Sequence, residues 1–433
     1  MIERGCFQIG ESQNTGILSF DTACCPTDIP SMAVSLHAGK YARLGHEIVI
    51  ANDFELSIDA PDIHRVEREE HILSDEHPAD YQKGTVLQYT IGPVDTFCRL
   101  PKAILPESVR VYSPESGVVY TEGIDYFLDH FWGGMSRIAS GSILPGQKVL
   151  IDYEVYLQRI DLIQISDDGK VFLKKGKSSV ICPSVSSVDD GCIPIASIYI
   201  PYRTTEITQS NICPYPAQDI SWRQFIKVSG SDCLRNTLTK LKNGRPVTVV
   251  CWGDSVTEGY SASSPDKNYV GLLVSYLKNT YPDTQINVIN SGIGASSTES
   301  RREEFDNEVL SHNPDLITVE FINDIYMPTD QISSNWHEFI SRARAHNPEI
   351  EFILLTPTFM MQEWMDRFDP AVAIMRNVAK DAGVALGDTT NIWAHLQGLG
   401  MPYETLLANN INHPDDLGHE FFAATLMELL GLK

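Results

Sequence analysis

The sequence has little positive charge, no long apolar run and no paired cysteine motif. Its 433 residues carry 33 Lys and Arg against 57 Asp and Glu, which gives a formal net charge of -24. A field of this sign repels polyanions, so nucleic acid is not an expected partner and a neutral ligand is favoured. No stretch approaches the roughly 20 apolar residues that cross a bilayer, so we expect no membrane insertion.

The first residues and the cysteines carry no targeting or metal motif. Met1 to Phe20 contain neither a basic start nor a continuous apolar segment, so no export signal is visible and a cytoplasmic location is favoured unless such a signal has been removed. The nine cysteines form no Cys-x-x-Cys pair, which predicts reduced, mostly buried thiols. The His- and Glu-rich run at 64–71 lacks a ligand spacing and is expected to be a solvated face. We expect no metal and no cofactor.

Residues 1–225 have the pattern of a β-rich region. Apolar and polar residues alternate at 109–112 and again at 151–157, which is typical of strands with one buried face. Asp168-Gly169 predicts a hairpin turn, and the Pro-Gly pair at 145–146 predicts another turn. We expect a sandwich-like fold, as one unit or as two modules divided near residue 90.

After a Pro-rich stretch at 214–216, helices and strands alternate. The predicted strands are 246–252, 285–290, 315–321, 350–355 and 384–386. The predicted helices are 232–241, 268–279, 299–310, 330–345, 369–382 and 416–430. Strands joined by crossover helices give a parallel sheet with helices on both faces. The sequence therefore predicts an α/β domain at 230–433, a three-layer, doubly wound fold with five parallel strands.

Polar blocks follow the predicted strands where such folds bind ligands, at the carboxyl ends. The apolar run at 247–252 stops at Gly253-Asp254-Ser255, a turn that is expected to expose the hydroxyl of Ser255. A small-residue block, Asn-Ser-Gly-Ile-Gly-Ala-Ser-Ser, occupies 290–297. Asn323-Asp324 follows the third strand, and His413 precedes the last helix. A serine next to an imidazole can act as a nucleophile, because the imidazole takes its proton.

The four blocks, in this order, resemble those of the SGNH, or GDSL-type, hydrolases, and the resemblance covers residues 232–433. It implies a flavodoxin-like fold with Ser255 as the nucleophile and His413 as general base and acid. It also implies that the oxyanion is held by the backbone N–H of Ser255, an N–H of the Gly294-Ala295 turn, and the side-chain amide of Asn323.

The sequence departs from this family at two positions. Ala295 stands where the family usually has a glycine that donates its amide. Asn410 stands three residues before His413, where the family has an acid. The ring is then oriented by the Asn410 side chain, by a backbone carbonyl or by another acid, and of these we expect the carbonyl. Asp415 and Asp416 are expected to cap the last helix.

The resemblance extends to two-domain acetyl-carbohydrate esterases, in which a β-rich module precedes or frames such a domain. We therefore expect a serine esterase that removes short acyl groups, O-acetyl above all, from an acylated saccharide through an acyl-enzyme. The short, polar loop at 258–268 favours small acyl groups, and the Met-rich loop at 359–365 lines a pocket or packs in the core. The alternatives are a thioesterase or lipase of the same fold, and a structural, adhesion or virion-associated glycan-binding protein with a degenerate hydrolase domain.

Overall fold

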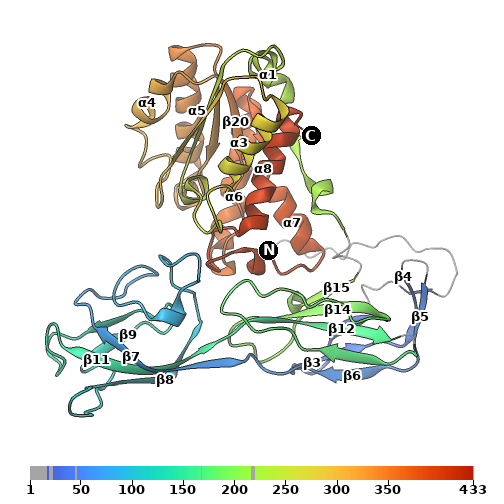
Figure 1. Ribbon diagram of the computed structural model, residues 1–433, viewed down its shortest axis with the longest axis vertical. Helices are drawn as coiled ribbons and strands as arrows, with labels where there is room; N and C mark the ends of the chain where they lie inside the picture. Colours follow the sequence, from blue (N-terminus) through green and yellow to red (C-terminus); the bar gives the residue numbers. More distant parts are fainter. Residues whose placement is uncertain (1–16, 19–22, 44–45, 167, 216–219, 433) are drawn as a thin grey trace.

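The computed structural model describes residues 17–18, 23–43, 46–166, 168–215 and 220–432. An α/β part, drawn from yellow to red, lies over an elongated β-rich part drawn from blue to green (Figure 1). Within the described residues, no helix is long and apolar enough to span a membrane.

The β-rich part has two units, and the core of one unit is shared by segments from both ends of this part, residues 23–58 and 159–214. We call it the first half of the β-rich part. One sheet joins β2 (Cys24–Pro26), β3 (Ala33–Leu36) and β6 (Phe54–Ser57), and another has the order β13-β12-β14-β15. The strands of the second sheet are β12 (Arg159–Ser166), β13 (Val171–Lys174), β14 (Cys192–Ile200) and β15 (Ile212–Pro214). Side chains of both sheets form one buried cluster. The predicted hairpin at Asp168-Gly169 is confirmed, because β12 and β13 pair antiparallel around it.

A small third sheet stands at the end of this half. It contains β1 (Ile17–Leu18), β4 (Gly39–Arg43) and β5 (His46–Ile50). Ile48 and Ile50 of β5 are buried in the same cluster.

The second half of the β-rich part has its own core. Its sheet has the order β7-β11-β8, made of β7 (Ile63–Ile72), β8 (Ile104–Tyr112) and β11 (Lys148–Tyr156). A hairpin of β9 (Tyr126–Leu128) and β10 (Met135–Arg137) covers it. The buried cluster extends from Leu73 to Val155, so a division near residue 90 would cut through a packed core. The His- and Glu-rich run lies on β7, where half-buried and exposed positions largely alternate.

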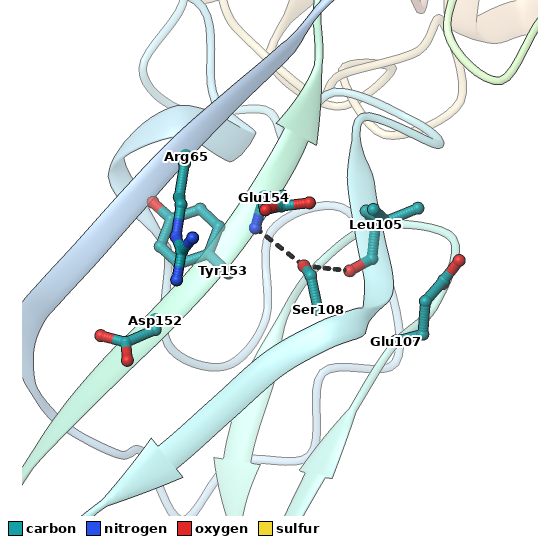
Figure 2. Close-up of a pocket in the computed structure, with 7 residues that line it drawn as sticks. All are labelled: Arg65, Leu105, Glu107, Ser108, Asp152, Tyr153 and Glu154. Carbon is teal, nitrogen blue, oxygen red and sulfur yellow. Dashed lines mark hydrogen bonds between the residues drawn. The ribbon is translucent and has the colours of Figure 1, made fainter.

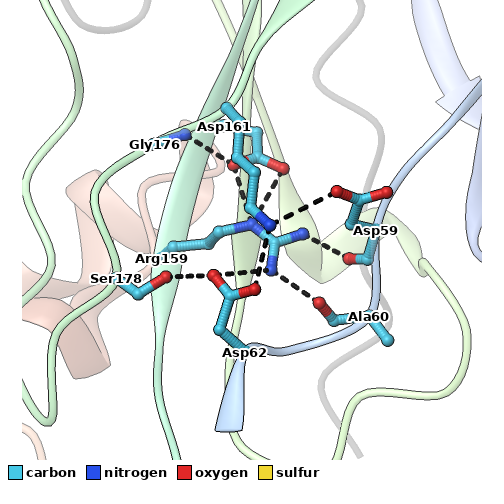
Figure 3. Close-up of polar contacts among 8 residues, drawn as sticks. Asp59, Ala60, Asp62, Arg159, Asp161, Gly176 and Ser178 are labelled. Carbon is cyan, nitrogen blue, oxygen red and sulfur yellow. Dashed lines mark hydrogen bonds and ion pairs between the residues drawn. The ribbon is translucent and has the colours of Figure 1, made fainter. Parts of the chain in front are cut away.

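A buried arginine joins the two halves (Figure 3). Arg159 of β12 pairs with Asp161, at 3.0 Å from Nε to Oδ1, and donates from Nη1 to the carbonyl of Ala60 at 2.6 Å. Its other guanidinium nitrogen donates to the carbonyl of Asp59. Because residues 59–62 connect β6 to β7, this cation fixes the connection between the two cores.

The α/β part contains the predicted parallel sheet and one further strand. The order is β16-β21-β20-β19-β17-β18. The strands are β16 (Val228–Ser229), β17 (Val247–Gly253), β18 (Ile286–Gly292), β19 (Leu316–Glu320), β20 (Glu351–Leu355) and β21 (Ala385–Gly387). Five of them pair parallel, whereas the two-residue β16 pairs antiparallel at the edge. The sheet therefore has six strands instead of the expected five.

Helices cover both faces of this sheet. The long ones are α1 (Arg235–Lys242), α3 (Tyr269–Thr280), α5 (Thr329–His346), α6 (Met365–Ala382), α7 (Thr390–Gly398) and α8 (Asp416–Leu430). The predicted helix at 299–310 is wrong, since only α4 (Phe305–Glu308) forms there. Ser297 and Ser300 bond each other's backbone N–H, and the N–H of Thr298 bonds Asp324. Such side-chain bonds compete with helix formation.

Candidate active site

Ser255 lies at a sharp turn between β17 and the short helix α2 (Ser255–Glu258). The Asp254 side chain caps this helix by accepting the N–H of Val256 at 3.1 Å. A Cβ at position 253 would lie 2.0 Å from the Thr257 hydroxyl and 2.2 Å from the carbonyl of Glu320, so only glycine fits there. The turn places Ser255 at the carboxyl end of the sheet with 5% of its surface exposed.

His413 faces this serine from the loop before α8. Its Nε2 lies 2.9 Å from the Oγ of Ser255, although the residues are 158 positions apart. The loop is shaped by Asn409, whose Oδ1 accepts the N–H groups of Ile411, Asn412 and His413. The arrangement allows His413 to remove the hydroxyl proton of Ser255.

The other ring nitrogen of His413 contacts an acid from the β-rich part. Nδ1 lies 2.6 Å from Oδ2 of Asp95, which is 318 residues away and 2% exposed. The expectation of a backbone carbonyl at this place is wrong, and so is a role for the Asn410 side chain. Asn410 has a φ of 53°, and none of the described residues bonds its buried Oδ1. Asp415 caps α8 through the N–H of Gly418, as expected.

Asp95 is held as a carboxylate. Burial alone would raise its pKa, but the hydrogen bond and charge of His413, with the backbone N–H groups of Cys98 and Phe97, keep the pKa below its ordinary value. Ser261 donates a further hydrogen bond to Oδ2 at 3.1 Å. Ser255, His413 and Asp95 are thus connected by hydrogen bonds in the order that a nucleophile, a base and an acid require.

Three N–H donors remain for an oxyanion. The Gly294 N–H donates to Oε2 of Glu258 at 2.6 Å, so it is engaged. Among the bonds of the described residues, none uses the backbone N–H of Ser255 or Ala295. Asn323 gives one Nδ2 hydrogen to the Ser296 carbonyl at 2.9 Å, which leaves the second hydrogen. The geometry therefore favours Ser255, Ala295 and Asn323 over Gly294.

Ala295 takes up the backbone conformation that glycine favours. Its φ is 58°, in the left-handed region, where an L side chain is strained by about 1–2 kcal/mol. The alanine thus keeps a left-handed turn at this place despite the missing glycine.

Three carboxyl groups are buried beneath the serine turn. Burial raises the pKa of Asp254 to about 7 and that of Asp324 to about 6, and it raises that of Glu320 well above its ordinary value, with the nearby Asp254 adding to the effect. Asp324 accepts bonds from Thr298 and from the Trp336 indole. These groups support the loops that carry Ser255 and Asn323.

Asp95, Cys98 and His413 also lie close enough together to consider a metal site, since their donor atoms are within 4.8 Å of one another. Burial, followed by the charge of Asp95, raises the pKa of the Cys98 thiol to about 12. Nδ1 of His413 and Oδ2 of Asp95 already bond each other at 2.6 Å, and Nε2 of His413 bonds the Ser255 hydroxyl. The donor set suits a proton-transfer site better than a metal centre.

Two other features lie apart from this site. A pocket of about 340 Å³ opens on the β7-β11-β8 sheet, where Ser108 bonds Glu154 and Leu105 (Figure 2). Its lining residues, which also include Arg65 and Glu107, offer no paired nucleophile and base. In the Met-rich loop, Phe359, Met360 and Met361 are buried, which favours core packing over a pocket lining.

Comparison with known proteins gives a family match for the α/β part of the chain. Residues 251–421 match the model of the GDSL-like lipase/acylhydrolase family. This part of the chain is a GDSL-type hydrolase domain. A second match, to a domain of unknown function (DUF4815), covers residues 108–249. Asp95 lies outside both matched segments.

Individual relatives cover the hydrolase domain. An acetylxylan esterase of Geobacillus stearothermophilus is 22% identical over 219 residues, which is 45% of this chain and 98% of the relative. A solved two-domain esterase active on acetylated mannans has 18% identity and a TM-score of 0.41, and the match covers 46% of this chain and 52% of that one. A solved acetyl xylan esterase variant from Geobacillus stearothermophilus has 20% identity and a TM-score of 0.38, covering 43% of this chain and 95% of that one.

Proposed function

We propose that the protein is a serine esterase that removes O-acetyl groups from a carbohydrate. The observation that carries the proposal is the continuous chain of hydrogen bonds from Ser255 through His413 to Asp95. A domain of the GDSL-like lipase/acylhydrolase family supports ester hydrolysis, and an acetylxylan esterase of similar length to this domain supports the acetylated saccharide.

The first half of the reaction forms an acyl-enzyme. The Oγ of Ser255 attacks the acetyl carbonyl carbon while its proton moves to Nε2 of His413. The carbonyl oxygen becomes an oxyanion that accepts hydrogen bonds from Ser255, Ala295 and Asn323. The intermediate then breaks the bond to the sugar oxygen, which takes the proton from His413 and leaves as an alcohol.

The second half returns the serine. A water molecule gives a proton to Nε2 of His413 and attacks the acyl carbon. The second tetrahedral intermediate breaks the bond to Oγ, which regains the proton, and acetate leaves. Asp95 stays ionised throughout and balances the imidazolium, because its own proton affinity is lowered by the bonds it accepts.

The first test is Ser255→Ala in the full chain, assayed on acetylated xylo- and manno-oligosaccharides. We expect turnover to fall to background while the protein stays folded, with at most a small change in the unfolding midpoint from the lost bond to His413. Ser275→Ala, on the outer face of α3 with its hydroxyl on the Gly271 carbonyl, is the control. Unchanged turnover of Ser255→Ala would refute the esterase assignment.

The dependence of activity on acyl chain length distinguishes a deacetylase from a lipase of the same fold. A deacetylase should lose activity steeply from acetyl to butyryl and octanoyl esters, whereas a lipase would gain. A fluorophosphonate probe should label Ser255 alone, and a degenerate domain would not be labelled.

A further inference from the structure

The acid that faces His413 does not come from the hydrolase domain. We infer that Asp95 is a positioning residue supplied by the β-rich part, so that the esterase site is complete only when the loop at 91–99 is docked against the hydrolase domain. The inference rests on the proposed function and adds a condition under which the site works.

The loop is built to present one carboxylate oxygen. Its ends are joined by a bridge between Ile91 and Arg99. Oδ1 of Asp95 accepts the N–H groups of Phe97 and Cys98, both at 3.1 Å, and so closes its own turn. Oδ2 is left for His413. Oδ1 therefore stabilises the loop, whereas Oδ2 contacts His413 in the active site.

The loop is held against the hydrolase domain on several sides. A Cβ at Gly92 would lie 3.0 Å from the carbonyl of Ala408, next to the histidine loop. The ring of Phe97 lies 6.3 Å from that of Tyr260, which in turn lies 5.5 Å from the His413 ring. Cys98 is buried in one cluster with Met361 and Ile411.

Neighbouring residues extend the contact. Lys102 pairs with Glu363, and the Trp132 and Tyr81 rings each lie 6.4 Å from that of Trp364. Apolar burial and aromatic ring contacts of this kind stabilise an interface more than an exposed ion pair does. The position of Asp95 therefore depends on packing between the two parts of the chain.

Charge is the property that the site requires at this place. As Ser255 gives up its proton, His413 becomes a cation, and an anion next to Nδ1 stabilises it. Asn410, which stands where the family has its acid, carries no charge, and its Oδ1 has no partner among the described residues. The carboxylate of Asp95 supplies what the hydrolase domain lacks there.

The test compares Asp95→Asn and Asp95→Glu in the full chain. If the negative charge at position 95 matters, Asp95→Glu should retain more activity than Asp95→Asn. Asp95→Asn should then lose about 10²- to 10⁴-fold in kcat, with KM nearly unchanged. If Asp95 only shapes its loop, the isosteric Asn should be tolerated better than the longer Glu. The rate at which a fluorophosphonate labels Ser255 should follow the same order, and this readout needs no natural substrate.

Asp129 offers a matched control. Its Oδ1 accepts the N–H groups of Phe131 and Trp132 at 2.8 and 2.7 Å, in the same turn geometry as Asp95, but it has no bond to His413. Because this turn also carries Trp132, which contacts Trp364, Asp129→Asn should lower kcat and the labelling rate far less than Asp95→Asn does. An equal loss in Asp95→Asn and Asp129→Asn would overturn the inference and indicate a structural role for both turns.

A second variant removes one contact of the same carboxylate. Ser261→Ala deletes the bond to Oδ2 without touching the turn, and should lower kcat several-fold with little change in KM. Full labelling and full turnover in both Asp95→Asn and Ser261→Ala would overturn the inference about Asp95. The proposed esterase function would be unaffected, because Ser255→Ala tests it separately.

Discussion

Replacing Glu320 by Gln should change how the stability of the protein depends on pH. Glu320 is fully buried, its Oε2 accepts a long 3.4 Å bond from Thr257, and none of the described residues bonds Oε1. Asp254, by contrast, accepts the N–H groups of Val256 and Asn323. Of this buried pair, we therefore expect Asp254 to ionise first and Glu320 to keep its proton.

The magnitude follows from the proton balance. In the unfolded chain Glu320 ionises near its ordinary pKa of 4.5, whereas in the folded chain burial, followed by the charge of Asp254, raises the pKa of this carboxyl well above that value. Above pH 4.5 the unfolded state thus binds fewer protons, so stability falls as pH rises, by about 1.4 kcal/mol per pH unit. Gln does not titrate. Between pH 5 and pH 6.5, the native protein should therefore lose more unfolding free energy than Glu320→Gln, by at most about 2 kcal/mol.

The assay is urea unfolding followed by tryptophan fluorescence, at pH 5 and pH 6.5, for both proteins. Any cost of fitting the Gln amide is independent of pH and cancels in the difference. The pH range ends below the pKa of about 7 of Asp254, and Asp324 titrates in both proteins, so their contributions cancel to first order. Parallel pH dependences in the two proteins would refute the buried, protonated state of Glu320.

Two substitutions test the oxyanion donors. Asn323→Ala should lower kcat about a hundredfold with a smaller effect on KM, because the donor acts mainly in the transition state; an effect on KM alone would make Asn323 a ground-state contact. Ala295→Gly should keep kcat within a few-fold and leave the unfolding midpoint equal or higher, since it removes the strain of a left-handed alanine and retains the N–H. A large loss of kcat in Ala295→Gly would show that the methyl group contacts the substrate.

The fold of the hydrolase domain could be predicted because local pattern and packing agree there. Each predicted strand lies within two residues of its observed bounds, as in β20 (Glu351–Leu355) and β21 (Ala385–Gly387), because buried parallel strands are short continuous apolar runs. The edge strand β16 (Val228–Ser229) has two residues and no periodicity, so no pattern indicates it. The missing helix at 299–310 depends on Asp324, which bonds the backbone of Thr298 from another loop. Domain limits near residue 225 stay a prediction.

The active-site residues also fall into those that the sequence could predict and one, Asp95, that it could not. Ser255, Asn323 and His413 follow strands or precede a helix of one domain, so their order in the sequence carries their positions in space. Asp95 has no such relation, because its place depends on how a loop of the β-rich part packs against Tyr260 and Met361. The sequence indicated only that an acid is missing. Asn410 stands where the family has an acid, so a negative charge next to His413 had to come from another part of the chain. With 57 acidic residues in the chain, only the packing of the two parts could identify which one.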